Sequence, residues 1–283
     1  MRSRNSEICE GGKTNMKNIP IMKPYFDQDE AKEAAAALAS GWVAQGPRVA
    51  EFEKMVAAHE GIAFGIATTN CTTALHLCMV VSGFGPGDDV IVPSYTFVAT
   101  PNAVEYTGAT AILSDADPRT YNIDPEKLSA LIQEKYAARD GQMINRATGN
   151  RLAGIVPVNL FGLCADIPAI NAIAARYGLK VIEDSACAFG AKIGGTHEGG
   201  FGNPSALSFH PRKSITTGEG GMVLTNDSDF AEHVRRLRSH AAAGIQRDRF
   251  QLPHDRHSGR HRYRADAQDR FHHPPPGRTG RAL

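Results

Sequence analysis

The chain has 283 residues, enough for one large domain or two modest ones around a sizeable core. Its 31 Lys and Arg residues against 30 Asp and Glu leave a formal net charge of +1, so charge does not indicate nucleic acid as a partner. No apolar run approaches membrane-spanning length, which excludes a membrane-spanning class on this criterion, and residues 1–17 lack the apolar segment of a signal peptide.

The five cysteines are irregularly spaced and form no C-x-x-C pair. An odd number of cysteines with this spacing indicates neither a disulfide framework nor a zinc site. We therefore expect no metal centre and a cytoplasmic location, where thiols stay reduced.

Helical patterns alternate with short apolar runs along the chain. Helices are expected at residues 27–39, 49–59, 73–81, 101–107, 124–138 and 167–177. Strands are expected at residues 89–92, 110–113, 153–158, 180–184, 206–209 and 222–225. The alternation predicts an α/β fold with a mainly parallel, buried sheet, whose ligands lie at the carboxyl ends of the strands. Residues 138–151 are expected to form an exposed excursion.

One lysine has unusual surroundings. Lys213 lies between the apolar run at residues 206–209 and the turn Gly218-Glu219-Gly220-Gly221. A lysine held on a tight turn beside buried strands loses solvation, which favours the neutral amine that a Schiff-base lysine needs. Taken alone, the pattern fits a surface lysine on a glycine turn better, so the interpretation depends on companion segments.

The companion segments also follow strands. Asp184 ends the apolar run at residues 180–184, where it serves either chemistry or a helix cap. Residues 67–76 run from a strand into a helix, whose unpaired amides suit a phosphate, although ordinary capping gives the same pattern. Phe97 follows the strand at 89–92 and either stacks on a flat heterocycle or packs in the core.

Together these segments resemble the DegT/DnrJ/EryC1/StrS family of sugar aminotransferases, which use pyridoxal phosphate (PLP). The stretch from Ser208 to Gly221 resembles the family's cofactor-lysine segment, and residues 67–76 are similar to its S-x-G-T-x-A-L-H. Residues 41–47 and 156–162 resemble two further segments, the second with Asn159 in a His position. The resemblance spans about residues 19–249 and implies a three-layer α/β/α large domain of the aspartate-aminotransferase type (PLP-dependent transferase type I).

The resemblance implies a role for each candidate residue. Lys213 would bind PLP covalently and shuttle protons, and Asp184 would face the pyridine nitrogen and keep it protonated. Phe97 would stack on the ring, and Ser208, five residues before the lysine, would bind the phosphate.

Two cysteines stand at positions where the family differs. Cys71 takes the Gly position of the phosphate segment, next to Thr72 in the Thr position, and the lost Gly is expected to make this turn less permissive. Cys187 stands where the family more often has Gln, and Phe189 where it has His. These changes affect ring-hydroxyl contacts and substrate preference and leave the cofactor assignment intact.

The implied activity is transfer of an amino group from an amino acid, glutamate first, to a nucleotide-linked keto sugar. The family implies a homodimer with a shared active site, and no nucleic-acid or membrane partner. Loss of the family's C-terminal part is expected to impair both the dimer and the shared site of this chain. Two alternatives stay open. One is a catalytically inactive fragment of such an enzyme, and the other is a related PLP enzyme such as a sugar dehydratase. Known dehydratases of this group carry His at the lysine position, so Lys213 argues against the second.

The sequence divides into three parts. Residues 1–18 are expected to be a disordered extension, residues 19–249 the PLP-binding large domain, and residues 250–283 a disordered tail. The tail is rich in Arg and His and poor in aliphatic residues. Reading its codons one base later permits S-N-Y-R-M-T-D-I-Q-A-A-I, which resembles the family segment after the lysine. We therefore interpret the tail as out of frame, replacing the family's small C-terminal domain, with its Arg and His marking neither nucleic acid nor metal.

Overall fold

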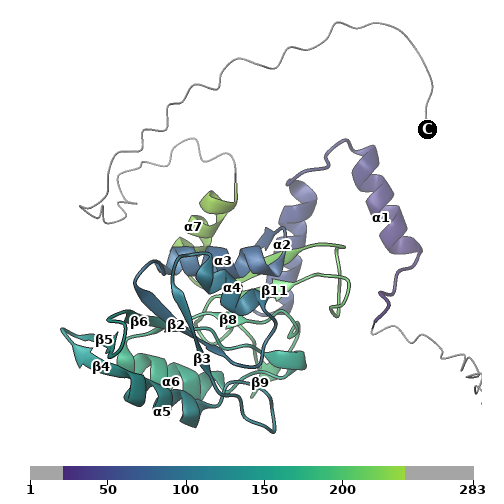
Figure 1. Cartoon of the computed structure of the whole chain (residues 1–283). Coiled ribbons are helices and arrows are strands. Elements are labelled where there is room, and N and C mark those ends of the chain that lie inside the picture. Colours follow the sequence, from purple (N-terminus) through teal and green to yellow (C-terminus); the bar gives the residue numbers. More distant parts are fainter. Residues whose placement is uncertain (1–21, 240–283) are drawn as a thin grey trace, which may run out of the picture. The chain divides into compact units, whose positions relative to one another are not determined.

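The computed structural model describes residues 22–239 (Figure 1). The expected extension at residues 1–18 and the expected out-of-frame tail at residues 250–283 lie outside the described residues, and both stay predictions. The large domain expected at residues 19–249 is described over most of its length.

The helices are α1 (Gln28–Ala39), α2 (Pro47–His59), α3 (Cys71–Ser82), α4 (Ala99–Glu105), α5 (Pro125–Lys135), α6 (Ile167–Tyr177), α7 (Ser228–Arg238) and the short 3-10 turn η1 (Leu160–Gly162). The strands are β1 (Phe64–Thr68), β2 (Asp88–Pro93), β3 (Thr110–Ser114), β4 (Tyr136–Arg139), β5 (Gln142–Asn145), β6 (Arg151–Ile155), β7 (Lys180–Val181), β8 (Glu183–Asp184), β9 (Lys192–Ile193), β10 (Thr196–His197), β11 (Ser205–Ser208) and β12 (Gly221–Thr225). Each expected helix and strand therefore has a counterpart, with ends shifted by a few residues.

The central strands are parallel, as predicted. Strands β3, β2, β6 and β7 run parallel in that order, and β8 runs parallel to β11. A parallel bridge between Val158 and Asp184 joins the two sets. Strand β12 pairs antiparallel with both β11 and β1, and the β4–β5 hairpin adds further antiparallel pairs. The fold is thus α/β with mixed sheets, and its antiparallel pairs lie outside the parallel central set.

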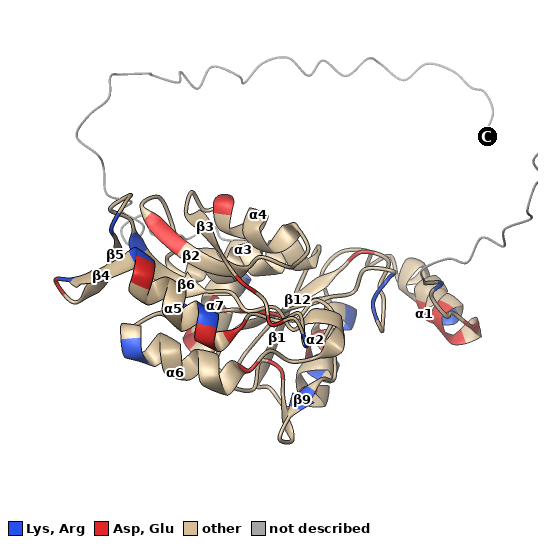
Figure 2. Ribbon diagram, turned by 60° about the horizontal axis from the view of Figure 1, so that its bottom comes forward, with Lys and Arg blue, Asp and Glu red and all other residues tan. Residues whose placement is uncertain are grey.

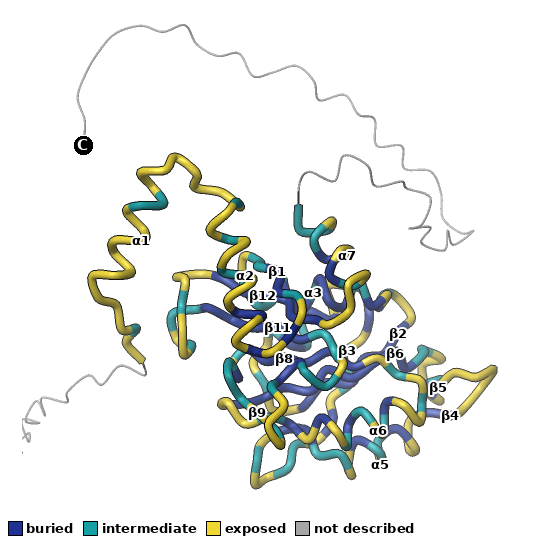
Figure 3. Tube along the Cα trace, turned by 180° about the vertical axis from the view of Figure 1, so that it is seen from behind, coloured by how far each residue is buried: buried dark blue, intermediate teal, exposed yellow. Residues whose placement is uncertain are grey.

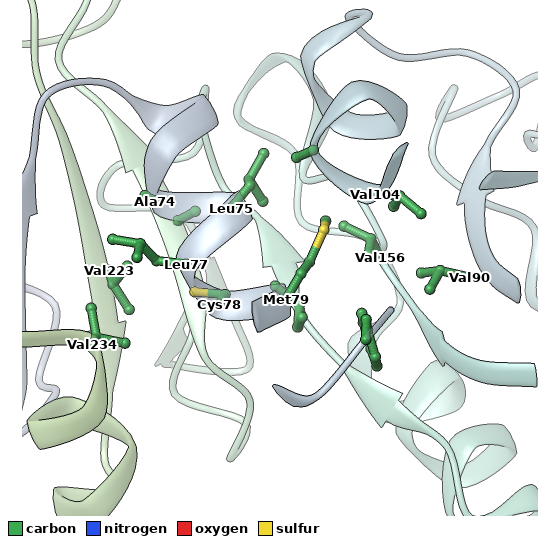
Figure 4. Close-up of a cluster of buried hydrophobic side chains, with 14 of the residues drawn as sticks. Ala74, Leu75, Leu77, Cys78, Met79, Val90, Val104, Val156, Val223 and Val234 are labelled. Atoms are coloured by element: carbon green, nitrogen blue, oxygen red, sulfur yellow. The ribbon is translucent and has the colours of Figure 1, made fainter. Parts of the chain in front are cut away.

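Helices cover both faces of these strands (Figure 1). Val90 and Val92 of β2 face the cluster built with α3 and α4, whereas Ile91 between them faces the cluster built with α5 and α6. Figure 4 shows the first cluster, in which α3 side chains lie between Val223 and Val234 on one side and Val90, Val104 and Val156 on the other. This alternation produces the three layers that the sequence predicted.

Successive side chains of β11 and β12 also alternate between two hydrophobic clusters. Ala206 and Val223 belong to the cluster around α3, while Leu207 and Met222 pack in a separate cluster with Val56 of α2. Burial of both faces explains why these strands are continuous apolar runs. They are among the buried segments in Figure 3, whereas α1 has no buried residue.

The expected exposed excursion at residues 138–151 is wrong in part. Strands β4 and β5 form a hairpin there. Residues 138–142 and 146–149 are exposed as expected, whereas residues 143–145, 150 and 151 are half-buried or buried. The buried carboxylate of Asp89 explains the order, because Tyr136 Oη, Asn145 Nδ2 and Asn150 Nδ2 donate to it at 2.9, 2.7 and 2.8 Å. The same strand pairing ends α5 at Lys135, before the expected end at residue 138.

Acidic and basic residues are interspersed over the described elements (Figure 2). None of the described helices is both long enough and apolar enough to cross a bilayer.

Candidate functional site

Three strand ends define one edge of the fold. Strands β1 and β11 both run antiparallel to β12, so they run in the same direction as each other. Strand β1 leads into α3, β8 ends at Asp184, and β11 leads into the loop that carries Lys213. The chemistry-bearing residues of the sequence therefore follow the carboxyl ends of strands, where ligands of such folds bind.

The first part of the site is a close approach between α3 and β12. Thr68, Gly221 and Ser208 lie side by side across β1, β12 and β11. Asn70 caps α3 and its Oδ1 accepts a hydrogen bond from Thr73 N at 2.8 Å. The amides of Cys71 and Thr72 belong to the first turn of the helix, which has no earlier carbonyl to bond them. The helix N-terminus thus presents donors next to the Ser208 strand end.

Gly221 is required for this approach. A Cβ at that position would lie 2.4 Å from the carbonyl carbon of Asn70 and 2.6 Å from Cys71 N, which are backbone atoms at the start of α3. Only a residue without a side chain lets the helix N-terminus come this near to β12.

Gly221→Ala will therefore displace the start of α3. We expect it to destabilise the fold by about 1–3 kcal/mol, because the clash is with backbone, and to weaken binding of a phosphate-bearing cofactor. Urea unfolding and a PLP absorbance titration measure the two effects. Gly85→Ala is the matched control, since a Cβ there meets its nearest neighbour, Thr107 O, at 3.9 Å. Equal behaviour of the two variants would contradict the assignment.

Cys71 does not need to be glycine for backbone reasons. The described non-glycine residues with positive φ are Tyr121, Asp140 and Phe161, so the expected strain at Cys71 is absent. Its thiol donates to Ala206 O at 3.5 Å. Burial raises the pKa of the Cys71 thiol, and the nearby carboxylate of Asp184 raises it further. The Cys71 thiol is therefore an uncharged, buried group beside Asp184.

Lys213 lies in the loop between β11 and β12. Thr216 Oγ1 and Thr217 N both donate to Phe209 O, at 2.7 and 3.1 Å, which closes the loop onto the end of β11. The lysine is half-buried, and its Nζ donates to Cys187 Sγ at 2.9 Å. Cys187 follows β8 by three residues, so this contact brings the lysine to the strand end that carries Asp184.

Asp184 is buried, with 5% of its surface exposed. Its Oδ2 accepts from Thr100 Oγ1 at 2.7 Å and its Oδ1 from Ala186 N at 3.1 Å. Burial raises the pKa of the Asp184 carboxyl, and the hydrogen bond from Thr100 opposes this most strongly, followed by the Ala186 amide and the charge of Lys213. The carboxylate thus lies in a low-dielectric position, within the field of the lysine.

The sequence analysis missed the residues that hold this strand end. Asn159 is fully buried, donates to Ser185 Oγ at 2.9 Å and Glu183 Oε2 at 3.2 Å, and accepts from Ala165 N at 2.8 Å. Thr100, also fully buried, holds Asp184. The signal for Asn159 was present, since it stands in a family position. Thr100 follows the expected aromatic by three residues and carried no signal of its own.

Phe97 is 75% exposed. It therefore does not pack in the core, which was the alternative interpretation of this residue. Its backbone carbonyl accepts from Thr100 N at 3.1 Å, so the aromatic lies on the segment that also holds Asp184. Stacking of its ring on a cofactor stays a prediction. Within residues 22–239, no group of three or more His, Cys, Asp and Glu side chains is arranged to hold a metal ion.

Fold and sequence together define the class. The model of the DegT/DnrJ/EryC1/StrS aminotransferase family matches residues 24–260. The chain belongs to this family.

Two curated relatives are similar over most of this chain. GDP-perosamine synthase of Caulobacter vibrioides is 42% identical over 226 residues, 80% of this chain and 57% of that protein. UDP-2-acetamido-2-deoxy-3-oxo-D-glucuronate aminotransferase of Pseudomonas aeruginosa is 40% identical over 196 residues, 69% of this chain and 50% of that protein. The chain thus spans about half the length of these relatives.

A solved structure agrees with the sequence comparison. An aminotransferase of the same family from Brucella abortus superposes with a TM-score of 0.71 at 37% identity, covering 77% of this chain and 57% of the other. The predicted large-domain fold of PLP-dependent aminotransferases is therefore confirmed.

Proposed function

We propose that this chain is the PLP-binding part of an aminotransferase that moves an amino group from an amino acid to a nucleotide-linked keto sugar. The observation that carries the proposal is the convergence of an amine, a buried carboxylate and a helix N-terminus at one edge of the fold. Membership of the family supports the reaction class, and the printed activities of the two relatives support the substrate class.

The residues at this edge fit PLP in their chemistry. A phosphate needs several donors, and the amides of Cys71 and Thr72 with the Ser208 hydroxyl offer them beside the close approach that Gly221 permits. A protonated pyridine needs an anionic partner, and Asp184 offers a carboxylate that is already buried and oriented. When bound, PLP would supply the electron sink for breaking a bond at the amino-bearing carbon.

The protein's own groups have separate tasks in this proposal. Lys213 Nζ would hold the cofactor covalently and, when free, would serve as a general base and acid that moves a proton. Asp184 would be the acceptor for the ring nitrogen, and Phe97 would be the aromatic partner of the ring. Cys187 lies against Lys213 Nζ and thus lines the space beside the amine.

The assignment of Lys213 has a direct test. Borohydride reduction of the protein mixed with PLP, followed by peptide mapping, is expected to place a pyridoxyl group on Lys213. Lys213→Met should abolish this label, whereas Lys192→Met, a lysine on the short strand β9, should retain it. Labelling at another lysine in protein that retains bound PLP would contradict the role.

Colour separates the main alternatives. A chain that binds PLP covalently absorbs near the violet edge of the visible range, whereas an inactive fragment that does not bind the cofactor is colourless. A dehydratase is disfavoured because Lys213 occupies the position where the resembled dehydratases have His.

Glutamate as amino donor is tested by the absorbance change that it causes in the bound cofactor. We place the reaction in the cytoplasm, since the four described cysteines are all free thiols.

We further propose that the partner of this chain is a second copy, as in the family. The N-terminal part of the described chain exposes large apolar side chains, namely Tyr25 (83%), Phe26 (56%), Leu38 (71%), Trp42 (60%) and Val43 (74%). Exposed apolar groups in such density are typical of an interface. Sedimentation velocity is expected to show a dimer that Leu38→Glu with Val43→Glu dissociates, and a wild-type monomer would contradict the proposal.

A further inference from the structure

The Asp184 carboxylate is held by two donors of different kinds. The Ala186 amide bonds Oδ1, and its single proton cannot turn away because the backbone fixes it. Thr100 Oγ1 bonds Oδ2 at 2.7 Å from α4, a distant part of the sequence. Both residues of this second contact are buried, with 0% of Thr100 and 5% of Asp184 exposed. No bulk water competes for either group, so the contact decides where Oδ2 points.

The hydroxyls of Thr96 and Thr100 have one proton each, and this decides which of them donates to the other. Thr96 Oγ1 lies 2.9 Å from Thr100 Oγ1. A hydroxyl carries one proton, and that of Thr100 is donated to the carboxylate. Thr96 must therefore donate to Thr100, which gives the chain Thr96 to Thr100 to Asp184. If Asp184 bound a proton on Oδ2, the Thr100 hydroxyl could no longer donate to that oxygen. The chain as it stands is thus matched to the ionised carboxylate.

The surroundings of Asp184 make this donor important. Burial alone favours the neutral acid, and a neutral acid cannot hold a protonated pyridine nitrogen. The other charged group that influences Asp184 is the Lys213 ammonium, which favours the carboxylate; the Cys71 thiol nearby is buried and neutral. The Lys213 amine would change its bonding when it reacts, whereas the hydrogen bonds from Thr100 and Ala186 would not, so these two bonds are the constant support of the carboxylate.

We propose that Thr100 is a positioning residue for amino transfer, which keeps Asp184 ionised and aimed, and that Thr96 fixes the Thr100 hydroxyl. This inference rests on the proposed function for its catalytic consequence, whereas its effect on the carboxyl group is independent of PLP. Thr96 directly precedes Phe97, so the segment that carries the exposed ring also carries the first donor of the chain. The segment from Thr96 to Thr100 would thereby carry both the aromatic side chain that faces the cofactor and the hydroxyls that hold Asp184.

The first experiment measures the carboxyl group without cofactor. The full chain is labelled with [γ-13C]aspartate, and the Asp184 resonance is identified by its loss in Asp184→Asn. Thr100→Val, which keeps the shape and removes the hydroxyl, is expected to shift the titration of this resonance to higher pH. Thr100→Ser should titrate as the wild type. Ser114→Ala is the control, because Ser114 is a buried hydroxyl without a hydrogen-bond partner among the described residues.

The second experiment measures the loaded protein. With PLP bound, Thr100→Val is expected to slow the absorbance change caused by glutamate about 10-fold, the usual cost of one lost bond to a charged group, with PLP affinity within about threefold of wild type. Thr100→Ser should restore the rate. Thr96→Val, at a half-buried position, should shift titration and rate in the same direction by less, and it tests the chain if Thr100→Val does not fold.

The outcomes separate the two proposals. A Thr100→Val titration identical to wild type, or equal effects of Thr100→Val and Ser114→Ala, would overturn the role of Thr100. A wild-type chain that binds no PLP, combined with the expected titration shift, would instead reject the proposed function and leave the support of Asp184 by Thr100 standing.

Discussion

Asp184→Asn is expected to reduce amino transfer by roughly 100-fold or more while the chain still binds PLP. An amide is neutral, so it cannot offset the positive charge that the pyridine nitrogen needs during bond breaking. Loss of one preorganised charged contact of this kind costs about 3 kcal/mol or more in the barrier. The measurement is the rate of the absorbance change that glutamate causes in the bound cofactor, together with the PLP dissociation constant.

The control for this variant is a second buried aspartate. Asp89→Asn removes a fully buried carboxylate that accepts from Tyr136, Asn145 and Asn150, at the opposite end of β2 from the site. It is expected to lower stability without changing the rate per bound cofactor. If Asp184→Asn keeps near-normal turnover, the carboxylate does not serve the ring nitrogen.

Local sequence predicted most of the fold because the central strands are short apolar runs. Strands such as β2 are buried on both faces, so hydrophobicity alone marks them, and α6 was predicted with the observed ends. The hairpin of β4 and β5 escaped because its strands have only four residues each, and Ala137 and Ala138 of β4 continue the helical pattern of α5. Its order depends on Asp89, which lies 47 and 56 residues away in sequence from the partners Tyr136 and Asn145. No local window contains that information.

Helix α7 was missed although its signals were present. Asp227 caps it by accepting from Asp229 N and Phe230 N, and the last turn carries Arg235, Arg236 and Arg238. An acidic start and a basic end are the charge pattern that the helix dipole favours. The helix lies directly before the change in composition near residue 250.

The residues of the candidate site also fall into two groups, those that the sequence predicted and those that it did not. The residues that would touch the cofactor were found from a resemblance, since their order along the chain is specific. The residues that support them were not found, because support depends on contacts between distant segments. Thr100 bonds Asp184 across 84 positions, and Asn159 reaches Ser185 across 26. Such contacts become visible only when the strand ends are placed next to each other.

A further group that the sequence did not mark is Glu198. It lies in a glycine-rich stretch after β10, a context that predicts an exposed loop, yet its exposed fraction is 0%. Ser205 Oγ donates to its Oε2 at 2.8 Å, while its Oε1 has no hydrogen-bond partner among the described residues. Burial raises the pKa of Glu198 to about 8, opposed by the serine hydrogen bonds, and the buried carboxylates of Glu183 and Glu60 raise it further.

Because folding raises the pKa of Glu198, the free energy of unfolding is expected to decrease as the pH rises. The folded chain holds the Glu198 proton up to about pH 8, whereas the unfolded chain releases it near 4.5. The stabilisation is therefore fully present below pH 4.5 and is lost as the pH rises through 8. Each unit of such a shift corresponds to about 1.4 kcal/mol, and relaxation of the site around the charge reduces the total.

Glu198→Gln is expected to remove this dependence, because the amide has the shape of the neutral acid and does not ionise. At pH 9 the variant should be more stable than wild type by roughly 2 kcal/mol, and at pH 4.5 the two should be nearly equal. Urea unfolding at several pH values measures the difference. Asp184, whose pKa burial also raises, is present in both chains, so its contribution cancels in the comparison.

Glu232→Gln is the matched control, since this glutamate forms an exposed pair with Arg236 at 2.9 Å and should change stability little at any pH. A Glu198→Gln chain that is less stable than wild type at pH 9 would contradict the prediction. It would mean that the folded protein stabilises the charge of ionised Glu198, so that burial does not raise its pKa.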